Sequence, residues 1–285
     1  MTARDYFRHI ADELTGILGS AGEGEGAARI LFEDIAGYDR KYLFANGDRE
    51  ITDFMAGKIA AAVEAVRNGL PVQYAVGKAL FMGMDFKVSP AVLIPRFETE
   101  GLVDMVTDRF GGRSDLDVLD ICTGSGCIAI AIARALPFAH VQATDISDEA
   151  LAIARENSRT LGSHVDFRLE DILKAPAPAP DSLDIVVSNP PYVLHSEAAG
   201  MDERVVGHEP AQALFVPDDN PLLFYRAIGA YAATALRKGG AIFFEINSRF
   251  PSQMCSLLQD LGFAEAVASR DYKGNWRYVT ATWPQ

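Results

Sequence analysis

The chain has 285 residues, of which 49% are hydrophobic, and its formal net charge at pH 7 is −13. It contains neither a run of roughly 18 apolar residues nor a secretory signal pattern, and its three cysteines lack paired spacing, so we expect a cytoplasmic protein. The acidic excess argues against a nucleic-acid partner, and the five histidines form no ligand spacing, so we expect no bound metal either.

Residues 1–75 carry the spacing of amphipathic helices and show no strand pattern. Apolar residues recur at steps of three and four, and the last of these segments ends at Asn68–Gly69, a typical helix stop. We therefore expect a helical bundle over 1–75. Residues 76–95 mix apolar residues such as Phe81 with turn formers such as Gly83, and this pattern predicts a β-hairpin linker.

From residue 96 to residue 285, predicted strands alternate with predicted helices. This alternation is typical of a doubly wound α/β fold with a mainly parallel sheet. One helix is expected to begin at Asn220–Pro221 and to stop at Gly239–Gly240. The predicted strands span residues 116–121, 140–144, 165–169, 183–188, 241–246 and 277–283.

A glycine-containing loop, Cys122–Gly126, separates the first of these strands from its helix. Glycines let a backbone turn sharply beside a ligand, and the helix N-terminus offers free N–H groups. Asp145 ends the next strand, where a carboxylate can accept both hydroxyls of a ribose. The loop therefore predicts a cofactor that carries a nucleoside. Asp120 could meet a cationic group and Asp171 an adenine amino group, which favours S-adenosylmethionine, while NAD stays an alternative at this point.

The segment Val187–Val193, with the sequence VSNPPYV, ends the strand 183–188. In an open α/β sheet this position shares a crevice with the glycine loop. Each proline holds the preceding residue extended and lacks an N–H group, so Asn189–Tyr192 offers carbonyl acceptors on a stiff backbone. Such a segment suits a planar –NH2 group, which the acceptors bind while Tyr192 covers its flat face. These residues predict methyl transfer to a planar nitrogen.

Taken together, the motifs resemble class I methyltransferases that act on planar nitrogen. From about residue 70 onward, the chain is similar to the HemK/PrmC family, which methylates a glutamine side chain in bacterial peptide chain release factors. The segments that carry this resemblance are PVQYAVG (71–77), LIPRFETE (93–100), DICTGSG (120–126), TDIS (144–147), SNPPYV (188–193), HEPAQALF (208–215) and GNWR (274–277).

The resemblance implies a seven-stranded Rossmann-like methyltransferase domain over 96–285 and a helical domain over 1–75 that contacts the protein substrate. It implies S-adenosylmethionine as cofactor, S-adenosylhomocysteine as product and a class 1 peptide chain release factor as partner. Asn189, Pro190 and Tyr192 would be catalytic, and together with Pro191 they would hold the glutamine. The implied cofactor site comprises Cys122, Thr123, Gly124, Ser125, Gly126, Asp145, Asp171, Ile172 and Asn189.

Two departures from the family pattern concern the cofactor site. Cys122 replaces a frequent glycine, which is tolerable if its side chain faces the sheet. Ile172 stands where an aromatic residue often packs on adenine, so the cofactor affinity of this chain should differ from that of such relatives.

Other functions share parts of this pattern. The same chemistry on a glutamine of a large-subunit ribosomal protein would use the same loop and NPPY segment, but LIPRFETE favours the release-factor branch. Adenine-N6 methylation of DNA also targets a planar –NH2 group, and the charge of −13 argues against it. A protein that binds S-adenosylmethionine without catalysis would have no chemical need for NPPY. An NAD-dependent oxidoreductase is disfavoured because no His, Tyr-Lys or Ser stands out as a hydride-transfer acid.

Overall fold

The structure is a computed structural model that describes residues 1–284, and these residues form two compact units. The helical unit consists of residues 1–78, 88–90 and 202–208. The α/β unit consists of residues 79–87, residues 91–201 and the described residues from 209 onward. The predicted domains at 1–75, 76–95 and 96–285, and the separate role of each, stay predictions.

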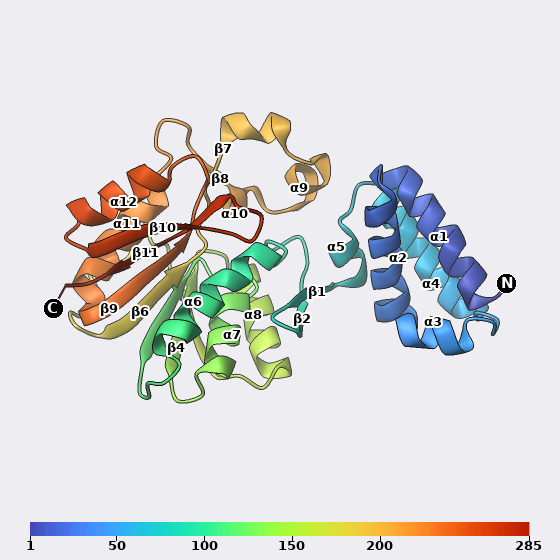
Figure 1. Ribbon diagram of the computed structural model, residues 1–285, viewed down its shortest axis with the longest axis horizontal. Helices are drawn as coiled ribbons and strands as arrows, with labels where there is room; N and C mark the ends of the chain where they lie inside the picture. Colours follow the sequence, from blue (N-terminus) through green and yellow to red (C-terminus); the bar gives the residue numbers. More distant parts are fainter. Residues whose placement is uncertain (285) are drawn as a thin grey trace. The chain divides into compact units, whose positions relative to one another are not determined.

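The helical unit contains five helices in its N-terminal part (Figure 1). Polar N-caps such as Thr2 and Ser20 begin these helices by accepting a backbone N–H, which satisfies a donor that the first turn leaves free. Leu14, Leu31 and Ile59 are fully buried in the shared core of this unit. The helices are α1 (Ala3–Leu18), α2 (Ala21–Ala36), α3 (Arg40–Asn46), α4 (Asp53–Arg67) and α5 (Val72–Val76), and the short helix α9 (Glu203–His208) also belongs to the unit.

The α/β unit is built on a seven-stranded sheet with the order β10-β11-β9-β6-β3-β4-β5. Strand β11 is antiparallel to both of its neighbours, and the other pairings are parallel. The prediction of a doubly wound, mainly parallel sheet is confirmed. The strands are β3 (Asp117–Ile121), β4 (His140–Asp145), β5 (Val165–Leu169), β6 (Leu183–Ser188), β9 (Leu236–Glu245), β10 (Ala264–Arg270) and β11 (Trp276–Thr282).

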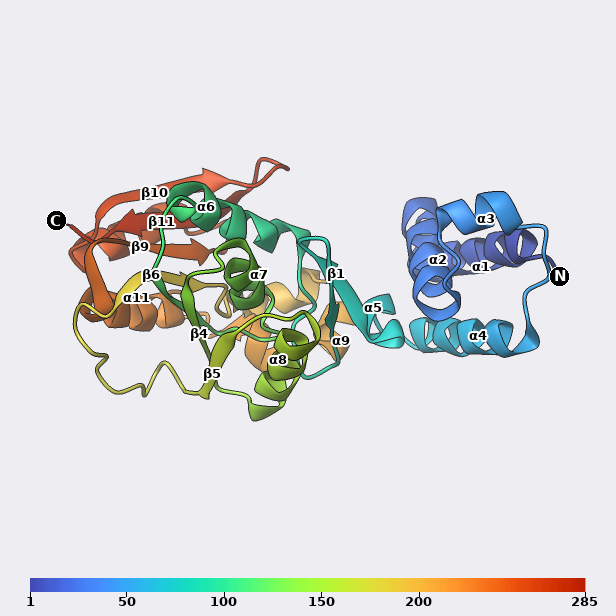
Figure 2. The ribbon, with the colours of Figure 1, turned by 90° about the horizontal axis from the view of Figure 1, so that it is seen from below.

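Helices cover both faces of this sheet (Figure 2). Because strand side chains alternate between the faces, Ile185 and Val187 of β6 pack in the core beneath α6 and α7, while Val186 packs in the core beneath α11 and α12. Helix α8 lies beside α7 and β5. The helices are α6 (Glu100–Phe110), α7 (Cys127–Ala135) and α8 (Asp148–Thr160) on one face, and α11 (Leu223–Ala235) and α12 (Pro251–Asp260) on the other.

Short elements occupy the connections. Strands β1 (Lys78–Phe81) and β2 (Met84–Lys87) form the hairpin that the sequence predicts, and Met82 and Gly83 turn the chain with positive φ angles of 49° and 70°. The remaining elements were not predicted: η1 (Phe97–Thr99), β7 (Val193–Leu194), η2 (His195–Gly200), α10 (Ala211–Leu214) and β8 (Phe215–Val216).

The predicted stop of the helix at Gly239–Gly240 is wrong. Helix α11 begins at Leu223, ends at Ala235, and is followed at once by β9, which contains both glycines. Gly239 has a φ of +80°, and a Cβ on Gly240 would lie 2.9 Å from the Asp184 carbonyl oxygen. The glycines therefore allow an irregular, closely packed strand rather than end a helix.

Candidate active site

The segments that the sequence singles out converge at one edge of the sheet. Strand β3 pairs with β4 on one side and with β6 on the other, so that Ile121 lies beside both Thr144 and Ser188. The Cys122–Gly126 loop, Asp145 and Asn189 follow these three residues directly, and they emerge together at the carboxyl ends of the strands. This is the position where open α/β sheets bind their ligands.

The glycine loop has a backbone that other residues could not easily adopt. Gly124 and Gly126 have φ angles of +55° and +82°. A Cβ on Gly126 would approach Ala154 and Ile130 to 3.1 Å, whereas a Cβ on Gly124 would meet nothing within 4 Å. The loop therefore packs tightly on α8 at Gly126 and leaves an open cradle at Gly124, which suits close approach of a ligand.

Cys122 also has a positive φ, 63°, which explains why glycine is favoured at this position. Its side chain is half-buried and packs against the core beneath α11 and α12, so it faces the sheet, as a tolerated cysteine must. Thr123 and Ser125 are buried in the same loop. Burial raises the pKa of the Cys122 thiol above its ordinary value, which disfavours the thiolate form.

Asp145 ties the end of β4 to the glycine loop. Its Oδ2 accepts the Gly124 N–H over 2.8 Å, and its Oδ1 accepts the Ser147 N–H over 2.9 Å. Burial raises the pKa of Asp145, and both backbone hydrogen bonds oppose that shift. Since each carboxylate oxygen can accept more than one hydrogen bond, Asp145 retains capacity for ribose hydroxyls.

Asp120 is 0% exposed, and its contact with a cationic ligand group stays a prediction. Its Oδ2 accepts the Thr123 hydroxyl over 2.5 Å and the Ala129 N–H over 3.2 Å, so it holds the loop and the start of α7. Its Oδ1 is buried and has no partner in residues 1–284. Burial raises the pKa of Asp120 to about 7.

Asp171 and Ile172 follow β5. Asp171 accepts the Lys174 ammonium over 2.8 Å and the Leu173 N–H over 3.0 Å. The hydrogen bond from Lys174 lowers the pKa of Asp171. Ile172 is half-buried and packs against the core beneath α11 and α12. Their assignment to an adenine site stays a prediction.

The Asn189–Tyr192 segment is braced at its last residue. The Tyr192 hydroxyl donates to Glu245 Oε1 over 3.0 Å, and the Tyr192 carbonyl oxygen accepts Asn247 Nδ2 over 3.1 Å. Pro190 and Pro191 are buried, and Asn189 is half-buried. Outside helices and strands, no backbone N–H among residues 1–284 donates to the carbonyl oxygen of Asn189 or Pro190. These carbonyl oxygens are therefore acceptors on a rigid segment.

A buried polar network behind this segment was missed by sequence reasoning. Glu245, at the end of β9, accepts the Thr99 hydroxyl over 2.7 Å as well as the Tyr192 hydroxyl, and the Arg277 guanidinium lies 3.9 Å from its carboxylate. Burial raises the pKa of Glu245, while the Thr99 hydrogen bond and the Arg277 charge oppose the shift. The sequence did offer one signal, an acidic residue that directly follows the apolar run AIFF. An apolar run of this kind predicts burial, so the acidic residue at its end needs a polar partner.

Two further ion pairs hold the segments that carry this network. Arg277 donates to Asp271, whose other hydrogen bonds come from the backbone of its own turn. Glu209, which is 4% exposed, accepts the Ile94 N–H over 3.2 Å and forms an ion pair with Arg96. The segments LIPRFETE, HEPAQALF and GNWR therefore support the edge of the sheet where Asn189 lies.

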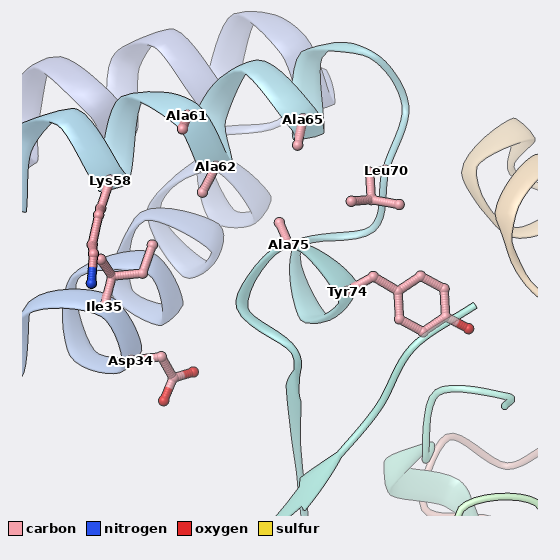
Figure 3. A pocket seen from close by; sticks show the side chains of 9 residues that line it. All are labelled: Asp34, Ile35, Lys58, Ala61, Ala62, Ala65, Leu70, Tyr74 and Ala75. Carbon is pink, nitrogen blue, oxygen red and sulfur yellow. The ribbon is translucent and has the colours of Figure 1, made fainter. Parts of the chain in front are cut away.

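Other features of the described chain lie apart from this network. A pocket of about 480 Å³ in the helical unit is lined mainly by residues of α2, α4 and α5, four of them alanines, with Asp34 on α2 and Lys58 on α4 (Figure 3). It contains none of the predicted site residues. Among residues 1–284, we find no cluster of three potential metal ligands. None of the helices in this part of the chain combines the length and hydrophobicity that crossing a bilayer requires.

Comparison with known proteins gives matches along most of the chain. The family model described as "PrmC N-terminal domain" matches residues 9–77, and the one described as "Methyltransferase small domain" matches residues 98–210. A release factor glutamine methyltransferase of Bacteroides thetaiotaomicron is 40% identical over 259 residues, which cover 91% of this chain and 92% of the relative. A protein of the same name from Bacillus subtilis is 35% identical over 269 residues, or 93% of each chain.

A solved methyltransferase structure from Pyrococcus furiosus shares the fold. It aligns with a TM-score of 0.50 and 18% identity, over 72% of this chain and 91% of that one.

Proposed function

The chain belongs to the release factor glutamine methyltransferase family, and from this membership we propose that it transfers a methyl group from S-adenosylmethionine to the side-chain amide nitrogen of a glutamine in a class 1 peptide chain release factor. The observation that carries the proposal is the identity of 35–40% over more than nine-tenths of each chain. An NPPY segment at the ligand edge of the sheet agrees with it.

The chemistry requires hydrogen-bond acceptors more than a strong base. An amide nitrogen is a poor nucleophile because its lone pair is delocalised into the carbonyl group. In the proposed complex, Asn189 Oδ1 and the Pro190 carbonyl oxygen accept the two N–H groups of the glutamine, which draws electron density onto the nitrogen and fixes its direction. Tyr192 covers one face of the amide, and Pro191 keeps the segment stiff. Orientation then contributes much of the rate.

The residues of the glycine loop fit an adenosine-bearing cofactor. The open cradle at Gly124 admits a ligand close to the backbone, and Asp145 has remaining acceptor capacity for ribose hydroxyls. When S-adenosylmethionine is bound, its sulfonium supplies an electrophilic methyl group, so that the amide nitrogen gains a methyl group and loses a proton. We propose that Cys122, Thr123, Ser125, Gly126, Asp171 and Ile172 complete this site.

We assign contact with the release factor to the helical part of the chain, residues 1–75, which the "PrmC N-terminal domain" model matches from residue 9 onward. An enzyme with this substrate must meet it where translation occurs, so we propose a cytoplasmic location. The names of the relatives favour the release factor over a ribosomal protein as substrate. The net charge of −13 does not favour DNA.

Incubation with isotope-labelled S-adenosylmethionine and purified release factor tests the proposal. We expect one methyl group on a single glutamine, identified by mass spectrometry of the digested factor. A ribosomal protein preparation and a DNA duplex, tested in parallel, should remain unlabelled. Label on either of these, with none on the release factor, would overturn the proposed substrate.

A further inference from the structure

The side chain of Asn189 can bind a substrate amide in only one of its two orientations. Its amide carries an acceptor, Oδ1, and a donor, Nδ2, which differ little in shape. The proposed reaction requires Oδ1 to face the glutamine, because the –NH2 group of the substrate donates hydrogen bonds. With Nδ2 in that place, the Asn189 –NH2 group would face the –NH2 group of the glutamine. Two hydrogen-bond donors do not bind each other, so the substrate nitrogen would turn away.

We infer that Thr99 and Glu245 form a hydrogen-bond relay that fixes the orientation of Asn189, an inference that rests on the function proposed above. Asn189 Nδ2 donates to Thr99 Oγ1 over 3.3 Å, and Thr99 Oγ1 donates to Glu245 Oε2 over 2.7 Å. The three groups come from distant parts of the chain: the end of η1, the loop after β6 and the end of β9. Both Thr99 and Glu245 act through Asn189 and are positioning residues.

The direction of the relay follows from counting hydrogens. A carboxylate has no hydrogen to give, so Thr99 must donate its single hydroxyl hydrogen to Glu245. On the side that faces Asn189, Thr99 Oγ1 then has only lone pairs to offer. A donor is the favourable partner for a lone pair, so Nδ2 turns toward Thr99 and Oδ1 is left on the opposite side. The charge of Glu245 thus determines which end of the Asn189 amide is available to the substrate.

The surroundings of Glu245 keep this direction. The Tyr192 hydroxyl donates to Oε1 over 3.0 Å, and the Arg277 guanidinium stands 3.9 Å from the same oxygen, so the carboxylate faces donors on both of its oxygens. Glu245 is 2% exposed and Thr99 3%, which leaves little access for water to offer either residue a different partner. A buried, satisfied network of this kind holds a single arrangement.

The first test compares two substitutions of Thr99 in the full-length protein, with S-adenosylmethionine and the release factor as substrates. Thr99→Val keeps the shape and removes the hydroxyl, so kcat should fall about 10- to 100-fold with little change in either KM. Thr99→Ser keeps the hydroxyl and should recover most of kcat. The control is Thr107→Val in α6, because within residues 1–284 the Thr107 hydroxyl bonds only the Asp104 carbonyl of its own helix. A Thr99→Val enzyme with kcat within about threefold of wild type overturns the relay.

The second test reverses the direction of the relay. In Glu245→Gln, the carbonyl oxygen of the new amide can still accept from Tyr192, but its –NH2 group faces Thr99 and donates to it. Thr99 must then donate to Asn189, which turns Oδ1 away from the substrate. We expect kcat to fall at least as far as in Thr99→Val, and the double variant to be no slower than either single variant. Losses that multiply in the double variant would show two independent structural effects and contradict the relay.

A measurement without substrate separates failure of the relay from failure of the proposed function. In the free wild-type protein, the Asn189 side-chain amide protons, identified by NMR through their loss in Asn189→Ala, should exchange slowly because Thr99 accepts one of them. They should exchange faster in Thr99→Val and remain unchanged in Thr107→Val. Unprotected protons in wild type would overturn the relay even if methyl transfer occurs. Protected protons in a wild-type enzyme that does not methylate glutamine would instead overturn the function.

Discussion

The two halves of the site are held in place by different means. The Cys122–Gly126 loop is held largely through its backbone, since the Gly124 N–H bonds Asp145 and the Thr123 N–H bonds the Thr144 carbonyl. The Asn189–Tyr192 segment is held by side chains from distant segments, among them Thr99, 90 residues away in sequence, and Arg277, 85 residues away. Cofactor binding should therefore tolerate side-chain changes that stop catalysis, and single substitutions should separate the two functions.

The sharpest separation is expected from Asn189→Ala. Loss of the amide acceptor should lower kcat by at least about a hundredfold, while the Kd for S-adenosylmethionine changes little because the loop and Asp145 are untouched. Isothermal calorimetry gives the Kd, and a radiolabel assay gives the rate. A variant with full activity would remove Asn189 from the catalytic role.

Asp145→Ala should have the opposite pattern. It removes the acceptor for the Gly124 N–H and for ribose, and we expect cofactor binding to weaken by about 1.5–3 kcal/mol, the range for hydrogen bonds to a charged group. At saturating cofactor, kcat should stay near that of wild type. An unchanged Kd would contradict the ribose assignment.

The contribution of Asp120, which holds the glycine loop, to the free energy of unfolding should depend on pH. Because its pKa is raised from 3.8 to about 7, the folded protein holds a proton that the unfolded chain lacks between these values. The contribution of this group to the free energy of unfolding therefore falls as pH rises toward 7, by at most about 1.4 kcal/mol per pH unit.

Urea unfolding of wild type and Asp120→Asn at pH 5 and pH 7 checks this expectation. The fluorescence of Trp276 and Trp283 reports the α/β unit, which contains both tryptophans. The unfolding free energy of wild type minus that of the variant should be smaller at pH 7 than at pH 5. A difference that is independent of pH would show that Asp120 titrates normally.

The smallest expected effect is that of Tyr192→Phe. The ring stays, but Glu245 loses one donor, so the free energy of unfolding should fall by about 1 kcal/mol. The rate should decline less than in Asn189→Ala, since Thr99 still bonds Glu245. Urea unfolding and the radiolabel assay measure both quantities. A rate loss equal to that of Asn189→Ala would show that the Tyr192 hydroxyl takes part in the reaction itself.

The fold could be predicted from the sequence where a local residue pattern alone determines the element. Strands β5 and β6 occupy the predicted residues because short apolar or alternating runs lie between turn formers. Strand β10 was not predicted, because its residues Ala264–Arg270 are mostly exposed and only small residues, Ala266 and Ala268, pack against the core from it. The two glycines of β9 predicted a helix end, since a local pattern does not reveal that Asp184 of the neighbouring strand approaches closely there.

The candidate site follows the same division. The glycine loop and NPPY are local motifs, so the sequence placed both at the ends of strands, where the structure has them. The roles of Thr99 and Glu245 could not be predicted, because their hydrogen bond joins residues 146 positions apart. Their polarity was visible in the sequence, but their partners depend on which strands are neighbours in the sheet.

The pairing of β9 with β11, in which Glu245 lies opposite Tyr278, also orders events during synthesis of the protein. A ribosome delivers residues 1–78 and the glycine loop early, whereas Arg277 is the last member of the buried network to leave the exit tunnel. An unfinished chain can shape its nucleoside cradle but lacks the brace behind Tyr192. The segment behind Tyr192 is therefore completed only after Arg277 has emerged from the ribosome.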